Sequence, residues 1–217
     1  SLFESVQLSS SFALRSTVTH GVSRLDMDQH EHNLVLAGFD NGAVMLYNLA
    51  NSTDGGVFDA VRWMSKHTGV ITHVQWFPAD NGACISSSMD GRVLVWDAEI
   101  SQVAAEFNLK AKVFCSSLRR DLAHQLIAAG TGGSAVQLCD LNSGSLSHTL
   151  RHSSPVYCCD WSPQGAHILA TGSLDGSAKV WDIRKSGFGP LLSLDWQQDH
   201  TVASRSFAGG GLNNQQY

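Results

Sequence analysis

Two segments of the chain repeat the same anchor residues at the same offsets. In each, a histidine lies 29 residues and a second tryptophan 20 residues before the tryptophan of a Val-Trp-Asp triplet, and an aspartate lies six residues before it. One segment runs from His67 to Trp96 and the other from His152 to Trp181. Several anchors at identical offsets indicate an internal structural repeat, which constrains the fold more strongly than composition does.

Two weaker copies extend the series. The stretch "NGAVMLYN" ends near Tyr47, and "GGSAVQLCD" carries Cys139 in the place of the tryptophan. The four anchors Tyr47, Trp96, Cys139 and Trp181 are then 49, 43 and 42 residues apart. This period is typical of WD repeats, in which four strands form one blade of a β-propeller.

The local chemistry also favours strands and tight turns. Asn-Gly and Asp-Gly pairs precede β-branched runs and favour two-residue hairpins, because type I′ turns need positive φ at both central positions. Pro78 and Pro163 follow the internal tryptophans, where a strand should end. We therefore predict an all-β WD-repeat propeller over residues 1–200 with about four blades, followed by an unmatched flexible tail over residues 201–217. A seven-bladed ring would need roughly 300 residues, so part of a larger propeller is favoured over a four-bladed closure.

The charge balance argues against several classes of partner. The net charge is −5 and the sequence pI is about 6.0, a poor match to a phosphate backbone, which requires clustered Lys and Arg. We therefore expect no direct nucleic-acid binding. No apolar run approaches the roughly 18 residues of a membrane span, so no membrane partner is expected.

Five cysteines lack any Cys-x-x-Cys spacing. We interpret them as buried thiols of a reducing compartment and expect no metal site and no cofactor. Cys158 and Cys159 are adjacent, and alternation along a strand places one side chain on each face. Core packing is favoured there over a redox or metal role.

The repeating polar residues have two interpretations. His67, Ser86, Asp90 and Trp96 form one set, and the second set comprises His152, Thr171, Asp175 and Trp181. A Ser-His-Asp catalytic triad is one interpretation. A structural tetrad, in which buried polar groups satisfy one another, is favoured because the residues recur in each repeat. We expect no catalytic residue and no enzyme.

The third repeat departs from this pattern. Lys110 lies 29 residues before Cys139, where a histidine is expected, and glycine replaces the turn aspartate. We expect this blade to be the least well tied of the four.

Arg184, two residues after the final Trp-Asp, is not required by a blade. The corresponding residues of the other repeats are Ala50, Glu99 and Asn142. Arg184 therefore belongs to the following loop, on a propeller face where side chains are free to meet partners. A docking residue and a solvated surface arginine both remain open from the spacing alone.

The Trp-Asp-x-Arg ending resembles the motif of WD-repeat substrate receptors of cullin-RING ubiquitin ligases. Asp175, Trp181, Asp182 and Arg184 fill the motif positions, and the similarity covers most of residues 17–200, including "VQLCDLNSGSLSHTL" and "WSPQGAHILATGSLDGSAKVWDIRK". The resemblance implies a seven-bladed, non-catalytic propeller that docks on the damaged-DNA-binding adaptor, with Lys185 beside Arg184. It further implies a nuclear role in transcription-coupled nucleotide excision repair, presenting protein substrates at stalled RNA polymerase II.

Two other functions compete with the receptor. A generic WD-repeat scaffold of another nuclear complex would be indifferent to Arg184, and a direct DNA-damage binder is disfavoured by the acidic composition. The stretch Val57–Thr68 is expected to be a loop that could present substrates.

Overall fold

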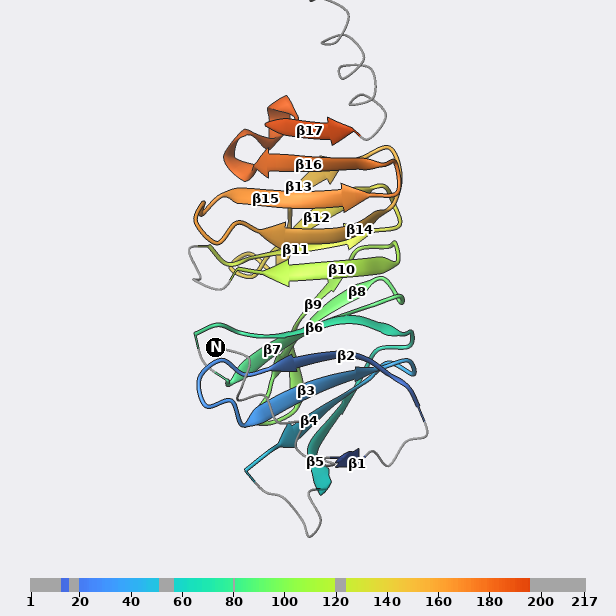
Figure 1. The fold of residues 1–217 in the computed structure, drawn as a ribbon, viewed down its shortest axis with the longest axis vertical. Coiled ribbons are helices and arrows are strands. Elements are labelled where there is room, and N and C mark those ends of the chain that lie inside the picture. Colours follow the sequence, from blue (N-terminus) through green and yellow to red (C-terminus); the bar gives the residue numbers. More distant parts are fainter. Residues whose placement is uncertain (1–12, 16–19, 51–56, 80, 120–123, 196–217) are drawn as a thin grey trace, which may run out of the picture.

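The computed structural model describes residues 13–15, 20–50, 57–79, 81–119 and 124–195. The predicted tail over residues 201–217 lies outside the described residues. The described chain folds into four β-sheets, stacked along the long axis of the molecule (Figure 1).

The four sheets follow one another along the sequence. The first contains β1 (Ala13–Arg15), β2 (Val22–Met27), β3 (Leu34–Phe39), β4 (Ala43–Asn48) and β5 (Val57–Ser65). The second contains β6 (Ile71–Trp76), β7 (Ala83–Ser88), β8 (Arg92–Asp97) and β9 (Gln102–Asn108). The third contains β10 (Val113–Leu118), β11 (Leu126–Thr131), β12 (Ala135–Asp140) and β13 (Ser145–Arg151). The fourth contains β14 (Val156–Trp161), β15 (Ile168–Ser173), β16 (Ser177–Asp182) and β17 (Leu192–Asp195), with the 3₁₀ helix η1 (Ile183–Phe188) between the last two strands.

Each sheet is an antiparallel meander of four consecutive strands, and β1 adds in parallel to β5 of the first sheet. The first strand of every sheet carries a register shift near its start, at Val22/Arg24, Ile71/His73, Val113/Cys115 and Val156/Cys158. A bulge at the same place in all four sheets shows that the repeat extends to the backbone. We refer to the sheets as blades one to four.

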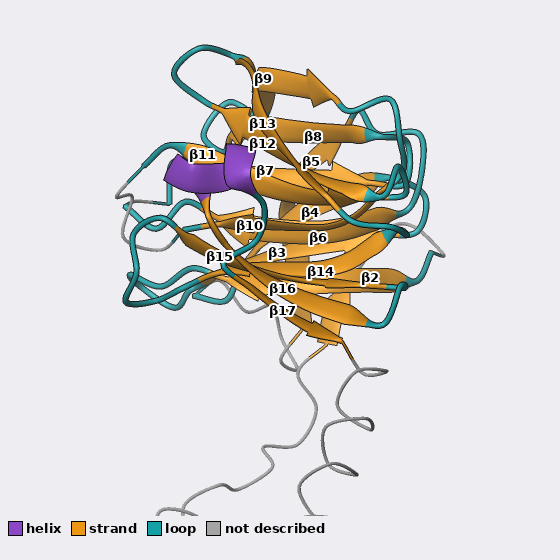
Figure 2. Cartoon of the chain, turned by 90° about the horizontal axis from the view of Figure 1, so that it is seen from above, coloured by secondary structure: helices purple, strands orange, loops and turns teal. Residues whose placement is uncertain are grey.

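Neighbouring blades contact each other through their first strands, β2 on β6, β6 on β10 and β10 on β14. Three apolar clusters fill the spaces between successive blades. Blade one and blade four lie at opposite ends of the stack (Figure 1), and Figure 2 shows the strands of the blades in the perpendicular view. The predicted all-β WD-repeat propeller fold is confirmed, with four blades in the described chain. Its membership of a seven-bladed ring stays a prediction.

Blade four has an open face. Ala178, Leu192 and Leu194 are exposed on its last two strands. The matching face of blade three packs on blade four through Val136, Leu138 and Leu150. Within the described residues no further blade covers blade four.

Two sequence expectations were wrong. Most of the predicted loop Val57–Thr68 is the strand β5, which pairs with β4 through a bulge and lies between β4 and β1 in blade one. Cys158 is exposed rather than buried, whereas Cys84 and Cys139 are buried. Cys158 pairs with Gly172 as Cys115 pairs with Gly130, so it points toward the open face of blade four.

Candidate functional site

The structure brings the four predicted residues of blade two together. The Ser86 hydroxyl lies 2.8 Å from His67 Nε2 and accepts a 2.7 Å hydrogen bond from Trp96 Nε1. The other ring nitrogen, His67 Nδ1, lies 3.0 Å from an Asp90 carboxylate oxygen. An indole N–H only donates and a carboxylate only accepts, so the chain of hydrogen bonds runs from Trp96 through Ser86 and His67 to Asp90.

Blade four repeats this arrangement, but its aspartate lies farther from the histidine. Thr171 Oγ1 lies 2.8 Å from His152 Nε2 and accepts a 2.8 Å bond from Trp181 Nε1. His152 Nδ1 is 3.6 Å from Asp175 Oδ2, beyond hydrogen-bond distance. Instead, Asp175 accepts a 2.6 Å hydrogen bond from the Ser177 hydroxyl.

The electrostatics keep both imidazoles neutral. Burial lowers the pKa of His67 and of His152 below 6.5, despite the neighbouring carboxylates. Burial alone would raise the pKa of Asp90, but hydrogen bonds from the Thr68 N–H and from Arg92 hold it below its ordinary value. The aspartates are therefore ionised and the histidines neutral near pH 7.

The catalytic-triad interpretation requires a nucleophile that substrate can reach. Ser86 has no exposed surface, Thr171 is 4% exposed, and each hydroxyl is already engaged by a histidine and a tryptophan. These groups join the strands of a blade and are not available to a substrate.

Blade three replaces the whole tetrad. Ala129 and Cys139 occupy the places of the serine and tryptophan, and both are completely buried in the apolar cluster between blades two and three. Gly133 and Lys110 stand where the aspartate and histidine would be. Because the polar members are replaced together, no buried partner is left unsatisfied, which makes the replacement far less costly than a single loss.

The turn that carries Arg184 is the same in every blade. An Asp or Asn at the end of the third strand accepts a hydrogen bond from the backbone N–H two residues later. The four donors are Ala50, Glu99, Asn142 and Arg184, at 2.8, 2.9, 2.9 and 3.1 Å. All four residues are exposed. The turn therefore fixes the backbone and leaves the side chain at this position free to vary.

Arg184 adds a bidentate ion pair to this turn. Its Nε and Nη2 donate to the two oxygens of Asp182 at 2.9 and 2.7 Å. The Arg184 side chain is 62% exposed, whereas that of Asp182 is 6% exposed. The hydrogen bonds from Arg184 lower the pKa of Asp182 to about 2. The guanidinium is thus held in one orientation while most of its surface faces outward.

The five residues predicted to contact an adaptor separate into two groups. Trp181 and Asp182 are buried and Asp175 is partly buried. Asp175 and Arg184 flank opposite ends of the six-residue strand β16, about 20 Å apart at 3.3 Å per residue. Only Arg184 and Lys185 are exposed, at the start of η1.

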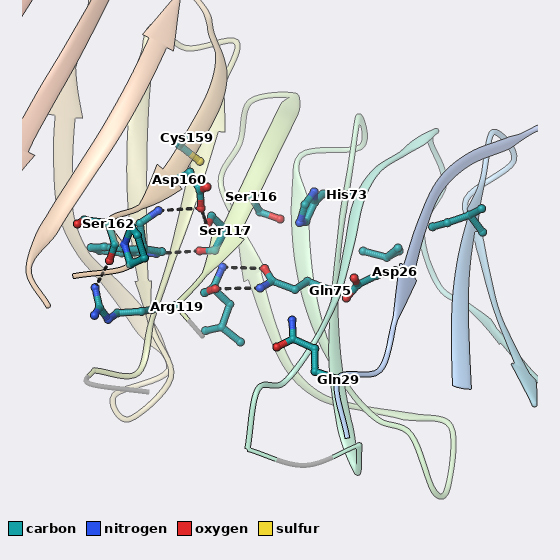
Figure 3. Close-up of a pocket in the computed structure, with 15 residues that line it drawn as sticks. Asp26, Gln29, His73, Gln75, Ser116, Ser117, Arg119, Cys159, Asp160 and Ser162 are labelled. Atoms are coloured by element: carbon teal, nitrogen blue, oxygen red, sulfur yellow. Dashed lines mark hydrogen bonds between the residues drawn. The ribbon is translucent and has the colours of Figure 1, made fainter. Parts of the chain in front are cut away.

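A cavity of about 560 Å³ lies where the first strands of the four blades converge (Figure 3). Its lining includes Leu118, Trp161 and Pro163, from the ends of β10 and β14. Because β14 and β16 run in the same direction, this end of the cavity lies at the same edge as Arg184.

Polar bonds between blades line this cavity, and the sequence analysis did not identify them. The Gln75 side chain donates to the carbonyl of Leu118 and accepts from its N–H, both at 2.9 Å, and Ser117 donates to Asp160 at 2.9 Å (Figure 3). Arg119 is only 4% exposed, and its Nη1 donates to the carbonyls of the chain that follows β14. The sequence signal that could have identified these residues is their position in the repeat, because Gln75 and Asp160 both directly precede the last residue of an inner strand.

Within the described part of the chain, no cluster of three or more His, Cys, Asp or Glu side chains could hold a metal ion. Over the same residues, no helix is long and apolar enough to cross a membrane.

The repeats match a known family. The model "WD domain, G-beta repeat" matches residues 59–97 and 144–182, which end at the third strands of blades two and four. Together with the four stacked meanders, this shows that the chain contains WD repeats.

The relatives and one solved structure are consistent with this class. The chain is 32% identical over 199 residues to the WD repeat-containing protein ATCSA-1 of Arabidopsis thaliana, covering 84% of this chain and 44% of that protein. It is 27% identical to the GATOR2 complex protein WDR24 of Danio rerio, over 71% of this chain and 20% of that protein. A chain of a mitotic checkpoint complex crystal structure matches with a TM-score of 0.71 at 20% identity, covering 83% of this chain and 54% of that one. The chain spans less than half the length of these two curated relatives.

Proposed function

We propose that this chain is part of a non-catalytic substrate receptor of a cullin-RING ubiquitin ligase that docks on the damaged-DNA-binding adaptor through Arg184 and Lys185. The proposed setting is the nucleus, in transcription-coupled nucleotide excision repair, with protein targets at stalled RNA polymerase II. The sequence resembles the Cockayne syndrome group A protein. The 32% identity to a relative named ATCSA-1 supports this proposal.

The observation that carries the proposal is the exposure of Arg184 on a turn shared by all blades. The guanidinium has five N–H donors, and the bonds to Asp182 leave the rest available for a partner. Because Asp182 already fixes its orientation, docking would cost less side-chain entropy than for an unrestrained arginine. Arginine is also a common hot-spot residue, and loss of a central one costs about 2 kcal/mol or more of binding free energy.

The test is co-purification of the chain with the purified adaptor, combined with a measurement of its oligomeric state. We expect a stoichiometric complex with the wild type and loss of it with Arg184→Ala. Arg184→Lys keeps the charge but removes the bidentate fork, so it should bind with intermediate affinity. Glu99→Ala is the matched control, because Glu99 occupies the same exposed turn position in blade two.

Two results would contradict the proposal. One is a monodisperse wild type that does not bind the adaptor. The other is equal binding by the wild type and Arg184→Ala, which would make the arginine a solvated surface residue.

A generic scaffold of another nuclear complex is the second candidate function. The relatives include a GATOR2 complex protein and a ribosome biogenesis protein. In that case pull-down from a nuclear extract recovers partners without the adaptor, and Arg184→Ala recovers the same set.

A further inference from the structure

Two thiols from neighbouring blades meet near the central cavity. Cys115 lies on β10 of blade three and Cys159 on β14 of blade four, and a sulfur–sulfur hydrogen bond of 3.4 Å joins them. A disulfide has a sulfur–sulfur distance of about 2.05 Å, so the two atoms need to approach by about 1.4 Å. Both strands are inner strands that contact each other directly.

A glycine creates the space for this contact. Gly130 pairs with Cys115 on the neighbouring strand β11. A Cβ atom at Gly130 would lie 2.5 Å from the Cys115 sulfur and 3.0 Å from the carbonyl oxygen of Val156. The absence of a side chain therefore lets the Cys115 sulfur sit between the two blades, against β14.

The two thiols differ in acidity. The hydrogen bond with Cys159 lowers the pKa of the Cys115 thiol, while the same bond and burial raise the pKa of Cys159. One thiol of the pair therefore ionises more readily than a thiol that is buried alone. In contrast, burial raises the pKa of Cys84 and of Cys139 to about 12, which leaves these two unreactive near neutral pH.

The cavity reaches one thiol of the pair. Cys159 lines the cavity of about 560 Å³ (Figure 3). Both Cys115 and Cys159 are partly rather than fully buried. The neighbouring Cys158 is exposed and points toward the open face of blade four, so it is a competing thiol that an experiment must remove.

We propose that Cys115 and Cys159 form a reversible oxidation site, which a low-molecular-weight disulfide converts into a covalent bond between blades three and four. The thiolate of one cysteine attacks one sulfur of the small disulfide, forming a mixed disulfide and releasing one small thiolate. The other cysteine then loses its proton to solvent and attacks the protein sulfur of the mixed disulfide, which displaces the second small thiolate. Two protein thiols are oxidised to one disulfide, and one small disulfide is reduced to two thiols.

The bond would join blade three to blade four. Blade three lacks the polar tetrad, and blade four carries Arg184. A disulfide here closes a loop of chain between residues 115 and 159 and thereby reduces the entropy of the unfolded state. Oxidation should therefore stabilise the interface between these blades against local opening.

The test uses the Cys158→Ser variant, so that any linkage to the β14 peptide involves Cys159. The folded protein is incubated with glutathione disulfide, remaining thiols are alkylated, and the proteolytic peptides are weighed. We expect a Cys115–Cys159 linked peptide that has lost two hydrogen atoms and that a reducing thiol separates. Adding Cys115→Ser should abolish the linked peptide, and so should adding Cys159→Ser.

Three outcomes would overturn the proposal. The linked peptide could be absent from folded Cys158→Ser, as judged by its circular dichroism. Glutathione could remain on one of the two cysteines without being displaced by the other. The linkage could also form as fast in urea as in the folded protein, which would show that the folded geometry does not bring the thiols together.

Discussion

Replacing Ser86 with alanine measures what the buried tetrad contributes to stability. The hydroxyl accepts from Trp96 Nε1 and lies 2.8 Å from His67 Nε2, in a site with no exposed surface. Its removal leaves one donor and one acceptor buried without partners. Each such group costs about 1–3 kcal/mol, so we expect a loss of about 2–6 kcal/mol in the free energy of unfolding.

The assay is equilibrium unfolding in urea, followed in parallel by circular dichroism and tryptophan fluorescence. For a chain of this size about 1 kcal/mol shifts the melting temperature by about 2–4 °C, so a fall of roughly 4–24 °C should accompany the change. Asn142→Ala, on an exposed turn, is the control and should change stability by less than about 0.5 kcal/mol.

A double mutant separates lost bonds from stranded partners. In Ser86→Ala/Trp96→Phe the indole N–H is removed together with its acceptor. The second substitution should then cost less than Trp96→Phe alone, with a coupling of about 0.5–3 kcal/mol. Additive losses, or a cost below about 0.5 kcal/mol for Ser86→Ala, would refute the view that the tetrad is a connected buried network.

Three further predictions follow from other parts of the structure. Because the folded pKa of His67 and of His152 lies below 6.5, the unfolded chain binds protons first as the pH falls. The contribution of the two histidines to the free energy of unfolding should be fully present above pH 6.5 and should fall below it, by up to about 1.4 kcal/mol per pH unit for each histidine. Urea titrations at several pH values measure this, and a flat profile would contradict it. In the same assay, Gly42→Ala should destabilise the protein more than Gly176→Ala. Both glycines have positive φ, but a Cβ at Gly42 would lie 2.6 Å from a backbone oxygen, whereas one at Gly176 meets nothing within 4 Å. Equal losses of stability in the two variants would exclude the clash. Arg119→Ala should cost roughly 1–3 kcal/mol, because it leaves carbonyls that follow β14 without their donor, and a neutral result would show that water replaces the guanidinium.

The blade pattern could be predicted from the sequence because its signals recur. A histidine, a turn aspartate and a tryptophan at fixed offsets specify where strands begin and end, and the same offsets place these side chains on one another. The strand β5 was not predicted, because the first copy of the repeat carries Tyr47 rather than tryptophan and has a longer interval before the next blade. Without an anchor at its start, Val57–Ser65 gave no signal that separated strand from loop.

Contacts between blades were beyond sequence reasoning for a different reason. The residue before the end of the inner strand is Gln75 in blade two, Ser117 in blade three and Asp160 in blade four, so the position recurs while the residue type does not. Each reaches a partner about one repeat away, and its chemistry suits that one partner only. The same holds for Cys115 and Cys159, whose approach depends on a glycine in a third strand.

The shared turn explains how blade four can carry an exposed arginine at this position without loss of fold. The Asp or Asn at the end of the third strand bonds to the backbone of the residue two positions later, whatever side chain that residue bears. Alanine, glutamate, asparagine and arginine are all accommodated at this position, because the side chain there is exposed and does not pack in the blade. In blade four the same aspartate also orients Arg184, so one carboxylate both ends the strand and fixes the guanidinium. The side chain at this turn position is therefore free to differ from blade to blade, whereas the tetrads join the strands within blades two and four.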